Sequence, residues 1–278
     1  MNRTDEFGGL DIIRAVPPGA PRREVAMRYV LAFICVLMLG LMGCSETTGT
    51  GGSGGIGGGA GGEGDVATVP HFLTTMESPP EGVKEGIGPP LAGVEACETD
   101  TSNCVTTDAD GKAQLMLPAN QEVSYIVSKD GYMSWMAAEV PDEISAVIQP
   151  LYLMYLDEDV EAFAEINMIP YPLTGGALLL HMNPLRTAGV TFALVDDGDA
   201  LAYYVDEDDN FRFDLIATTV NGLGGFFEVA PGERQVEFGG TATNCTAALG
   251  WPGDAPNRVR FPVRVGHITL ASMNCPRD

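Results

Sequence analysis

Short apolar runs separated by glycine, proline and acidic residues make up most of the chain after residue 88. In 112–117 (KAQLML), polar and apolar residues roughly alternate, which is typical of a strand with one buried face. Val123, Tyr125 and Val127 fall on one face of a second predicted strand. Many short runs of this kind, in a chain with 35 Gly and 19 Pro, favour an all-β architecture.

The strand pattern also predicts particular turns and faces. In the sequence DADG (108–111), Gly111 stands where a β-hairpin requires a positive φ. Further along, Phe227 and Val229 alternate as two residues on the same face of a strand.

One segment has a helical pattern instead. Residues 156–173 (LDEDVEAFAEINMIPYPL) begin with acidic residues, which are favourable at a helix N-terminus. We predict a short helix that ends before Pro170, with one apolar face. The residues of that face are Val160, Phe163, Ala164 and Ile166.

The chain contains an internal repeat. AGVEA (92–96) and TTDADGKAQLMLPANQEVSYIV (106–127) are echoed by AGVTF (188–192) and TTVNGLGGFFEVAPGERQVEF (218–238). The Ala-Gly-Val elements lie 96 residues apart. A period of about 100 residues predicts two copies of a domain, not a solenoid.

The first copy, AGV…TTDADGKAQLMLP…VSYIVSKDGYM, resembles the carboxypeptidase regulatory-like domain, a prealbumin-like (transthyretin-like) β-sandwich. The second copy, with Tyr203-Tyr204 and ATTVNGLGGFFEVAPGE, is similar to variants in secreted lipoproteins of myxobacteria and their relatives. The resemblance covers residues 88–150 and 175–278 and implies two such sandwiches. Domains of this family are accessory modules on enzymes, transporters and adhesins, so the resemblance implies little about function.

The N-terminus has the features of an export signal. An apolar run at 29–43 follows Arg22, Arg23 and Arg28, and this order is typical of a secretory signal peptide. The run has about 15 residues, whereas a membrane-spanning helix needs about 20, which disfavours the alternative of a retained transmembrane helix. Met27 is a possible true start.

The apolar run ends in Leu41-Met42-Gly43-Cys44, which resembles the bacterial lipobox. The resemblance implies cleavage before Cys44 and acylation of that residue with chains such as palmitate. Two or more acyl chains hold a protein stably on a membrane. Ser45, by analogy with known sorting rules, indicates the outer membrane. The alternative is an unmodified cysteine at an ordinary cleavage site.

A Gly-rich segment follows Cys44. Residues 47–65 contain 11 Gly, which is typical of a flexible linker. It does not fit a phosphate-binding loop, because no Gly-Lys-Ser/Thr follows it. The sequence is therefore divided into a signal peptide (1–43), a lipidated Cys and linker (44–65), an irregular or edge segment (66–88), a first sandwich (89–155), a linking helix (156–174) and a second sandwich (175–278).

Four cysteines remain after the lipidated one, two in each predicted sandwich. Of the three possible pairings, Cys97–Cys104 and Cys245–Cys275 is the natural one. Disulfides persist in an oxidising envelope, which agrees with export. A metal or redox site is the alternative, although the sequence has no C-x-x-C.

Charge and motifs exclude several functions. The net charge of −23, from 38 acidic and 15 basic residues, disfavours nucleic acid as a partner. His71, His181 and His267 are isolated in the sequence, and H-E-x-x-H does not occur. G-x-S-x-G occurs only as GGSGG (51–55) inside the Gly-rich segment, without the strand-turn-helix context that a nucleophilic serine requires. We therefore predict that the chain is not an enzyme and has no catalytic residue.

One acidic cluster is a candidate calcium site, and no other cofactor is expected. Ca²⁺ takes six to eight oxygen ligands, which an acidic hairpin would supply. EF-hand spacing is absent, so solvated turn carboxylates are the alternative. The candidate ligands are Asp196, Asp197, Asp199, Asp206, Asp208 and Asp209.

Two aromatic pairs, Tyr203-Tyr204 and Phe226-Phe227, suit either a carbohydrate- or peptide-binding patch or a β core. Together these patterns predict a non-enzymatic cell-envelope lipoprotein, a structural or binding module at the outer membrane or cell surface. Its partners would be the membrane, through the lipid anchor, and an unknown envelope protein or glycan. The alternative is an accessory carbohydrate- or peptide-binding component of a transport or secretion complex.

Overall fold

The structure is a computed structural model that describes residues 66–78, 88–142, 150–183, 187–196, 198–208 and 210–275. The predicted signal peptide, Cys44 and the Gly-rich linker all lie outside the described residues.

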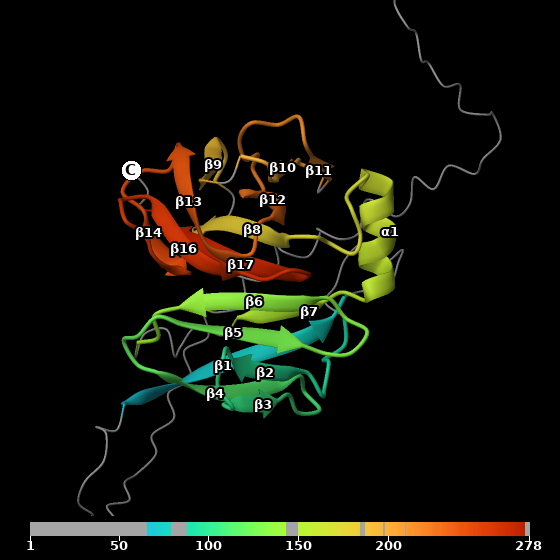
Figure 1. The fold of residues 1–278 in the computed structure, drawn as a ribbon, viewed down its shortest axis with the longest axis vertical. Helices are drawn as coiled ribbons and strands as arrows, with labels where there is room; N and C mark the ends of the chain where they lie inside the picture. The colour runs from blue at the N-terminus through green and yellow to red at the C-terminus, as the bar shows by residue number, and fades with distance from the viewer. Residues whose placement is uncertain are drawn as a thin grey trace, which may run out of the picture.

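The described chain is almost entirely β, with one short helix (Figure 1). The first half contains β1 (Thr68–Glu77), β2 (Glu95–Glu98), β3 (Cys104–Thr106), β4 (Lys112–Pro118), β5 (Val123–Ser128), β6 (Ser134–Glu139) and β7 (Leu151–Met154). The second begins with α1 (Asp157–Asn167) and continues with β8 (Gly176–Asn183), β9 (Val190–Val195), β10 (Leu201–Val205), β11 (Phe211–Arg212), β12 (Leu223–Val229), β13 (Gly232–Gly240), β14 (Thr246–Leu249), β15 (Trp251–Pro252), β16 (Arg258–Val263) and β17 (His267–Asn274).

These strands form three sheets. A ten-stranded sheet has the order β11-β10-β12-β8-β17-β6-β5-β2-β3, with β14 paired to β17 off this path. A three-stranded sheet has the order β4-β1-β7, and a four-stranded sheet the order β15-β16-β13-β9. The large sheet therefore runs through both halves of the chain.

The strand orders show the repeat in three dimensions. The order β4-β1-β7 of the first copy matches β12-β8-β17 of the second, and β2-β5-β6 matches β9-β13-β16. Each copy is thus a sandwich of two sheets. The copies join where β17 pairs in parallel with β6. The sheet β2-β5-β6 of the first sandwich therefore continues into the sheet β12-β8-β17 of the second, which is not its counterpart in the repeat.

Because of this junction, the two smaller sheets cover opposite faces of the large one, as the packing of its residues shows. On β6, Trp135 belongs to the core of the first sandwich and Ala138 to the core of the second. On β8, the adjacent Leu179 and Leu178 divide between the same two cores. Since neighbouring residues of a strand point to opposite faces, the two cores lie on the two sides of one sheet.

The repeated Ala-Gly-Val elements adopt the same conformation in both copies. Gly93 and Gly189 have φ values of 72° and 82°, which favour glycine. The Oγ1 atoms of Thr107 and Thr218 each accept a 3.0 Å hydrogen bond from the N–H of the valine that follows this glycine. The repeat found in the sequence is therefore a repeat of local structure.

The prediction that residues 66–88 are irregular or an edge is wrong for β1. This strand lies in the middle of its sheet, antiparallel to β4 and parallel to β7. Its buried face consists of His71, Leu73 and Thr75. Two of these residues are polar, so the apolar alternation that reveals other strands is missing here.

The turn before β4 is only partly as predicted. Gly111 has the expected positive φ of 70°. A Cβ at this position would also lie 2.2 Å from the carbonyl oxygen of Thr75. However, β4 pairs with β1 and β3 pairs with β2, so the turn crosses between two sheets and does not close a hairpin.

A bulge overturns one predicted strand face. The pairing of β12 with β8 shifts register between Phe226 and Val229, and Glu228 has a φ of 58°. Phe227 and Val229 consequently pack in different clusters. One extra residue in a strand reverses the side chains that follow it.

The predicted linking helix is confirmed as α1, which ends at Asn167 with Met168 in the left-handed region. Val160, Phe163 and Ala164 pack against the core of the first sandwich. Ile166 does not, and is 43% exposed. Ile166 is only about 60° from Phe163 around the helix but about 160° from Ala164, the buried residue of α1, so the prediction that it belongs to the apolar face is wrong.

Candidate functional site: a cavity beneath the helix

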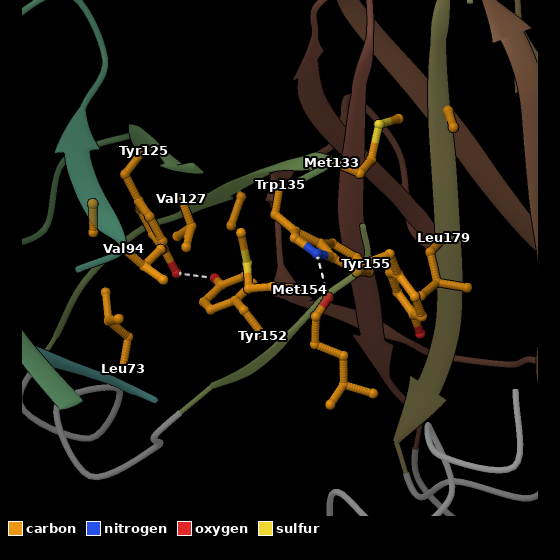
Figure 2. Packing of buried hydrophobic residues seen from close by; sticks show 14 of the residues in the cluster. Leu73, Val94, Tyr125, Val127, Met133, Trp135, Tyr152, Met154, Tyr155 and Leu179 are labelled. Carbon is orange, nitrogen blue, oxygen red and sulfur yellow. Dashed lines mark hydrogen bonds between the residues drawn. The ribbon is translucent and has the colours of Figure 1, made fainter. Parts of the chain in front are cut away.

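Helix α1 packs over one face of the large sheet, close to the junction of the two sandwiches (Figure 1). Between them lies a cavity of about 90 Å³, lined almost entirely by apolar side chains. Figure 2 shows Trp135, Tyr155 and Leu179 meeting at this junction. Because Trp135 belongs to the first sandwich and Leu179 to the second, only the assembled pair of copies forms the cavity.

Aromatic rings make one wall of the cavity. Tyr203 stacks on Phe227 with ring centroids 4.7 Å apart and lies 4.8 Å from Phe211. Phe163 of α1 lies 4.6 Å from Phe211. The Tyr203 hydroxyl donates a 2.9 Å hydrogen bond to the carbonyl oxygen of Leu178, so its polar atom is satisfied within the sheet.

The edge of the cavity is acidic. Among the described residues that line it, Asp159 is the only charged one, and it is exposed. Tyr171 also lines the cavity, and burial together with the nearby Asp157 and Glu161 raises the pKa of its phenol. No described lysine or arginine lines the cavity. Its rim therefore has a negative potential.

Apolar surface continues outward from the aromatic wall. Leu201 is the register partner of Phe227 on β10, and the ring of Phe213 lies 6.5 Å from that of Phe227. Leu201 is 41% exposed and Phe213 is 38% exposed. A hydrophobic molecule that enters the cavity would therefore meet further apolar contacts at its edge.

A second polar feature is enclosed in the first sandwich. His71 Nδ1 lies 2.9 Å from Glu139 Oε1, and His71 Nε2 lies 2.9 Å from the hydroxyl of Tyr125. That hydroxyl is 2.7 Å from the hydroxyl of Tyr152 (Figure 2). None of the four residues is more than 5% exposed, so this network supports the core and does not face a substrate.

The three histidines lie in separate places. His181 on β8 is buried, and burial lowers its pKa to about 4, so it is neutral at pH 7. Ser272 is its neighbour on β17, and both residues have a buried polar atom without a hydrogen-bond partner. His267 Nδ1 lies 2.8 Å from the carbonyl oxygen of Val265.

Both predicted disulfides are confirmed. Cys97–Cys104 joins β2 and β3 at a directly paired position. Cys245–Cys275 ties the segment before β14 to the end of β17. Glu95 lies close to the first pair of sulfurs, but a disulfide has no thiolate to offer a metal ion.

Within the described part of the chain, the predicted calcium ligands do not come together as a group. Asp206 accepts hydrogen bonds from the backbone N–H groups of Asp208 and Asn210, and its carboxylate lies 3.5 Å from Arg212. Asp197 and Asp209 lie outside the described residues. Asp196 and Asp199 are exposed and join no described group of three ligands at metal-binding distance. Calcium binding stays a prediction.

The aromatic pairs of the second copy are mostly core. Tyr203, Tyr204 and Phe226 are buried, and Phe227 is half-buried against α1. Sequence reasoning did not identify the cavity, because its residues come from separate strands of both copies. The only feature of the sequence that pointed toward it was the apolar face of the predicted helix, because such a face must pack against another apolar surface.

Comparisons with known proteins give no family. No family model matches the chain, and no curated protein matches it. Among solved structures, the shaft pilin SpaA of Lactobacillus rhamnosus GG is 11% identical, with 76% of this chain and 99% of that one covered and a TM-score of 0.23. The minor pilin GBS52 of Streptococcus agalactiae is 12% identical, with 76% and 97% covered and a TM-score of 0.22. The TIE protein of Bacillus anthracis is 13% identical, with 75% and 34% covered and a TM-score of 0.23. Scores this low do not establish a shared fold.

No helix within the described residues is long and apolar enough to span a membrane.

Proposed function

We propose that the chain is a non-enzymatic lipoprotein of a bacterial cell envelope, anchored by acyl chains on Cys44. Its acidic β body would act as a structural or binding module at the outer membrane or cell surface. The observation that carries the proposal is the pair of disulfides, one in each sandwich. Disulfides persist in oxidising compartments, which is where an export signal ending at Cys44 would deliver the chain.

The shared sheet supports a structural role. Two ordinary domains joined by a linker move independently, but here β17 pairs with both β6 and β8. The indole N–H of Trp251 also donates to the carbonyl oxygen of Val123 in the other sandwich. The body is therefore one stiff unit, which suits a spacer or a display platform.

The non-enzymatic assignment is supported by the chemistry of the enclosed sites. The cavity beneath α1 is lined by apolar groups, and the His71 network lies inside the core. Catalysis by a general base or nucleophile needs polar groups that converge on a space open to substrate. The cavity lacks such polar groups, and the His71 network lacks such an open space.

A second candidate function is an accessory carbohydrate- or peptide-binding component of a transport or secretion complex. It is favoured by exposed apolar residues in the connection from β11 to β12. Ile216 is 85% exposed and Val220 is 50% exposed, close in sequence to Phe213. Exposed apolar surface of this kind marks contact sites when it is contiguous.

The anchoring claim is tested by membrane fractionation of Cys44→Ala in a bacterium that processes lipoproteins. Wild-type chain is expected in the outer-membrane fraction, and the variant in the soluble fraction. Cys35→Ala is the matched control, because Cys35 lies in the segment that cleavage would remove. Mass spectrometry of the native protein completes the test: an intact leader, or an unmodified thiol at Cys44, contradicts the proposal.

A pull-down with wild type and Ile216→Ser separates the two roles. A partner that is recovered by wild type and lost by the variant supports the accessory binding component. If wild type and variant recover the partner equally, Ile216 does not contribute to partner binding.

A further inference from the structure

The cavity beneath α1 limits its occupant by size. An engineered apolar cavity of roughly 150 Å³ stays dry and binds benzene, whereas this one has about 90 Å³. By the same ratio of cavity volume to carbon atoms, about three or four carbon atoms of an aliphatic chain fill the enclosed space, and a ring is too large. Asp159 is exposed and Tyr171 is half-buried, so the lining reaches solvent and a small molecule has a way in.

The walls select an apolar chain. Trp135 donates its indole N–H to the carbonyl oxygen of Leu153, and Tyr203 donates its hydroxyl to Leu178. These groups are already satisfied and offer nothing to a polar ligand. A ligand would instead gain from removing its own apolar surface from water.

The rim selects a positive charge. Asp157, Glu158 and Asp159 occupy the first turn of α1. The helix dipole contributes roughly half a positive charge at this end, which three carboxylates outweigh. Aromatic faces also attract cations, and Trp135 and Tyr171 belong to the same lining as Asp159.

We propose that this cavity binds the apolar tail of a short aliphatic amine, with the ammonium group held beside Asp159. This site goes beyond the proposed envelope role, and it holds whether or not Cys44 is acylated. Longer tails would extend from Phe227 onto the exposed Leu201 and Phe213.

Isothermal titration calorimetry with the purified full chain tests the proposal. The probes are pentylamine, pentanol and pentanoate, which share a tail and differ in the charge of the head group. Pentylamine is expected to bind at least about tenfold more tightly than pentanoate. Across propyl-, butyl- and pentylamine, affinity is expected to rise by about fourfold per methylene.

Three variants locate the site. Ala164→Leu fills the cavity from α1 and is expected to abolish binding while the chain stays folded, as circular dichroism would show. Ala177→Val fills it from β8 and serves if the first variant does not fold. Asp159→Asn is expected to remove the preference for the amine over the alcohol. Glu165→Gln is the matched control, because it removes an exposed carboxylate of α1 that does not line the cavity.

Several outcomes would overturn the proposal. Absence of saturable binding by all three probes would show a packing void without a ligand. Equal binding by wild type and both cavity-filling variants would place the ligand elsewhere. Equal affinity for amine and carboxylate would contradict the charge assignment. None of these results depends on the fractionation of Cys44→Ala, so the two proposals fail separately.

Discussion

At the scale of single residues, buried polar groups impose the strictest requirements. His71, Tyr125 and Tyr152 are enclosed among apolar side chains and hydrogen-bond one another. Glu139 Oε1 lies 2.9 Å from His71 Nδ1 but lacks hydrogen-bond geometry. A buried polar atom that loses its partner is penalised by its full desolvation free energy. The stability of this core therefore depends on its buried polar residues as well as on its leucines.

Tyr125→Phe is expected to destabilise the protein by about 1–3 kcal/mol, because it leaves His71 Nε2 and the Tyr152 hydroxyl without their shared partner. Urea unfolding measures the change. Tyr132→Phe is the control, since its hydroxyl bonds Glu77 near the surface and its loss costs less. Equal effects of the two substitutions would contradict the role of the network.

His181 makes stability depend on pH. Burial lowers its pKa from 6.5 to about 4, so between these values the unfolded chain binds a proton that the folded chain does not. The free energy of unfolding is therefore expected to fall as pH drops from 6.5 to 4, by roughly 3 kcal/mol. His181→Gln should remove this part of the slope. An unchanged slope in the variant would show that other groups cause it.

At the scale of elements, α1 packs in the same core cluster as Ala177 and Leu179 of β8, so it covers this part of one face of the large sheet. Phe163 is its main contact, with ring neighbours Phe211 and Phe227. The hairpin β10–β11 supplies Tyr203 and Phe211 to the surface beneath the helix.

Phe163→Ala is expected to destabilise the protein by about 2 kcal/mol, less than a fully buried phenylalanine, because the ring is half-buried. Ile166→Ala, at a side chain of α1 that is 43% exposed, should change stability by no more than about 0.5 kcal/mol. Thermal unfolding by circular dichroism compares them. A larger effect at Ile166 would mean that the apolar face of α1 is misassigned.

At the scale of the whole molecule, the two sandwiches share one sheet. Besides the β6–β17 pairing, Arg260 pairs with Glu122 and Arg264 with Asp100 across the junction. These exposed ion pairs contribute little individually, so the backbone pairing is the main connection.

A shared sheet predicts a single cooperative unfolding transition. Calorimetry should give equal calorimetric and van't Hoff enthalpies, because neither copy can lose its half of the sheet alone. Leu115→Ala, in the core of the first sandwich, should shift the whole transition to lower temperature. Two resolved transitions, with only one shifted, would show that the copies unfold independently.

The two disulfides should differ in their contribution to stability. They close loops with sequence separations of 7 and 30 residues. In the chain-entropy model the longer loop contributes more, by about 1 kcal/mol. Replacing Cys245 and Cys275 by serine should therefore lower the unfolding free energy more than replacing Cys97 and Cys104. The reverse order would indicate that strand pairing dominates over loop closure.

The sequence by itself determined the local features. The strand of 112–117, the positive φ of Gly111 and the helix before Pro170 depend on neighbouring residues, and the cysteine pairing followed from two cysteines in each copy of the repeat. Propensity and periodicity act over these short distances, so they are readable without a structure.

Only the tertiary structure decided how the copies combine. The parallel pairing of β17 with β6 joins residues more than 100 positions apart, and nothing in either strand specifies that partner. The same holds for β1, whose buried His71 and Thr75 conceal its alternation. The cavity beneath α1 exists because these long-range pairings bring Trp135 and Phe227 to one place, and a linear pattern carries no record of such distances.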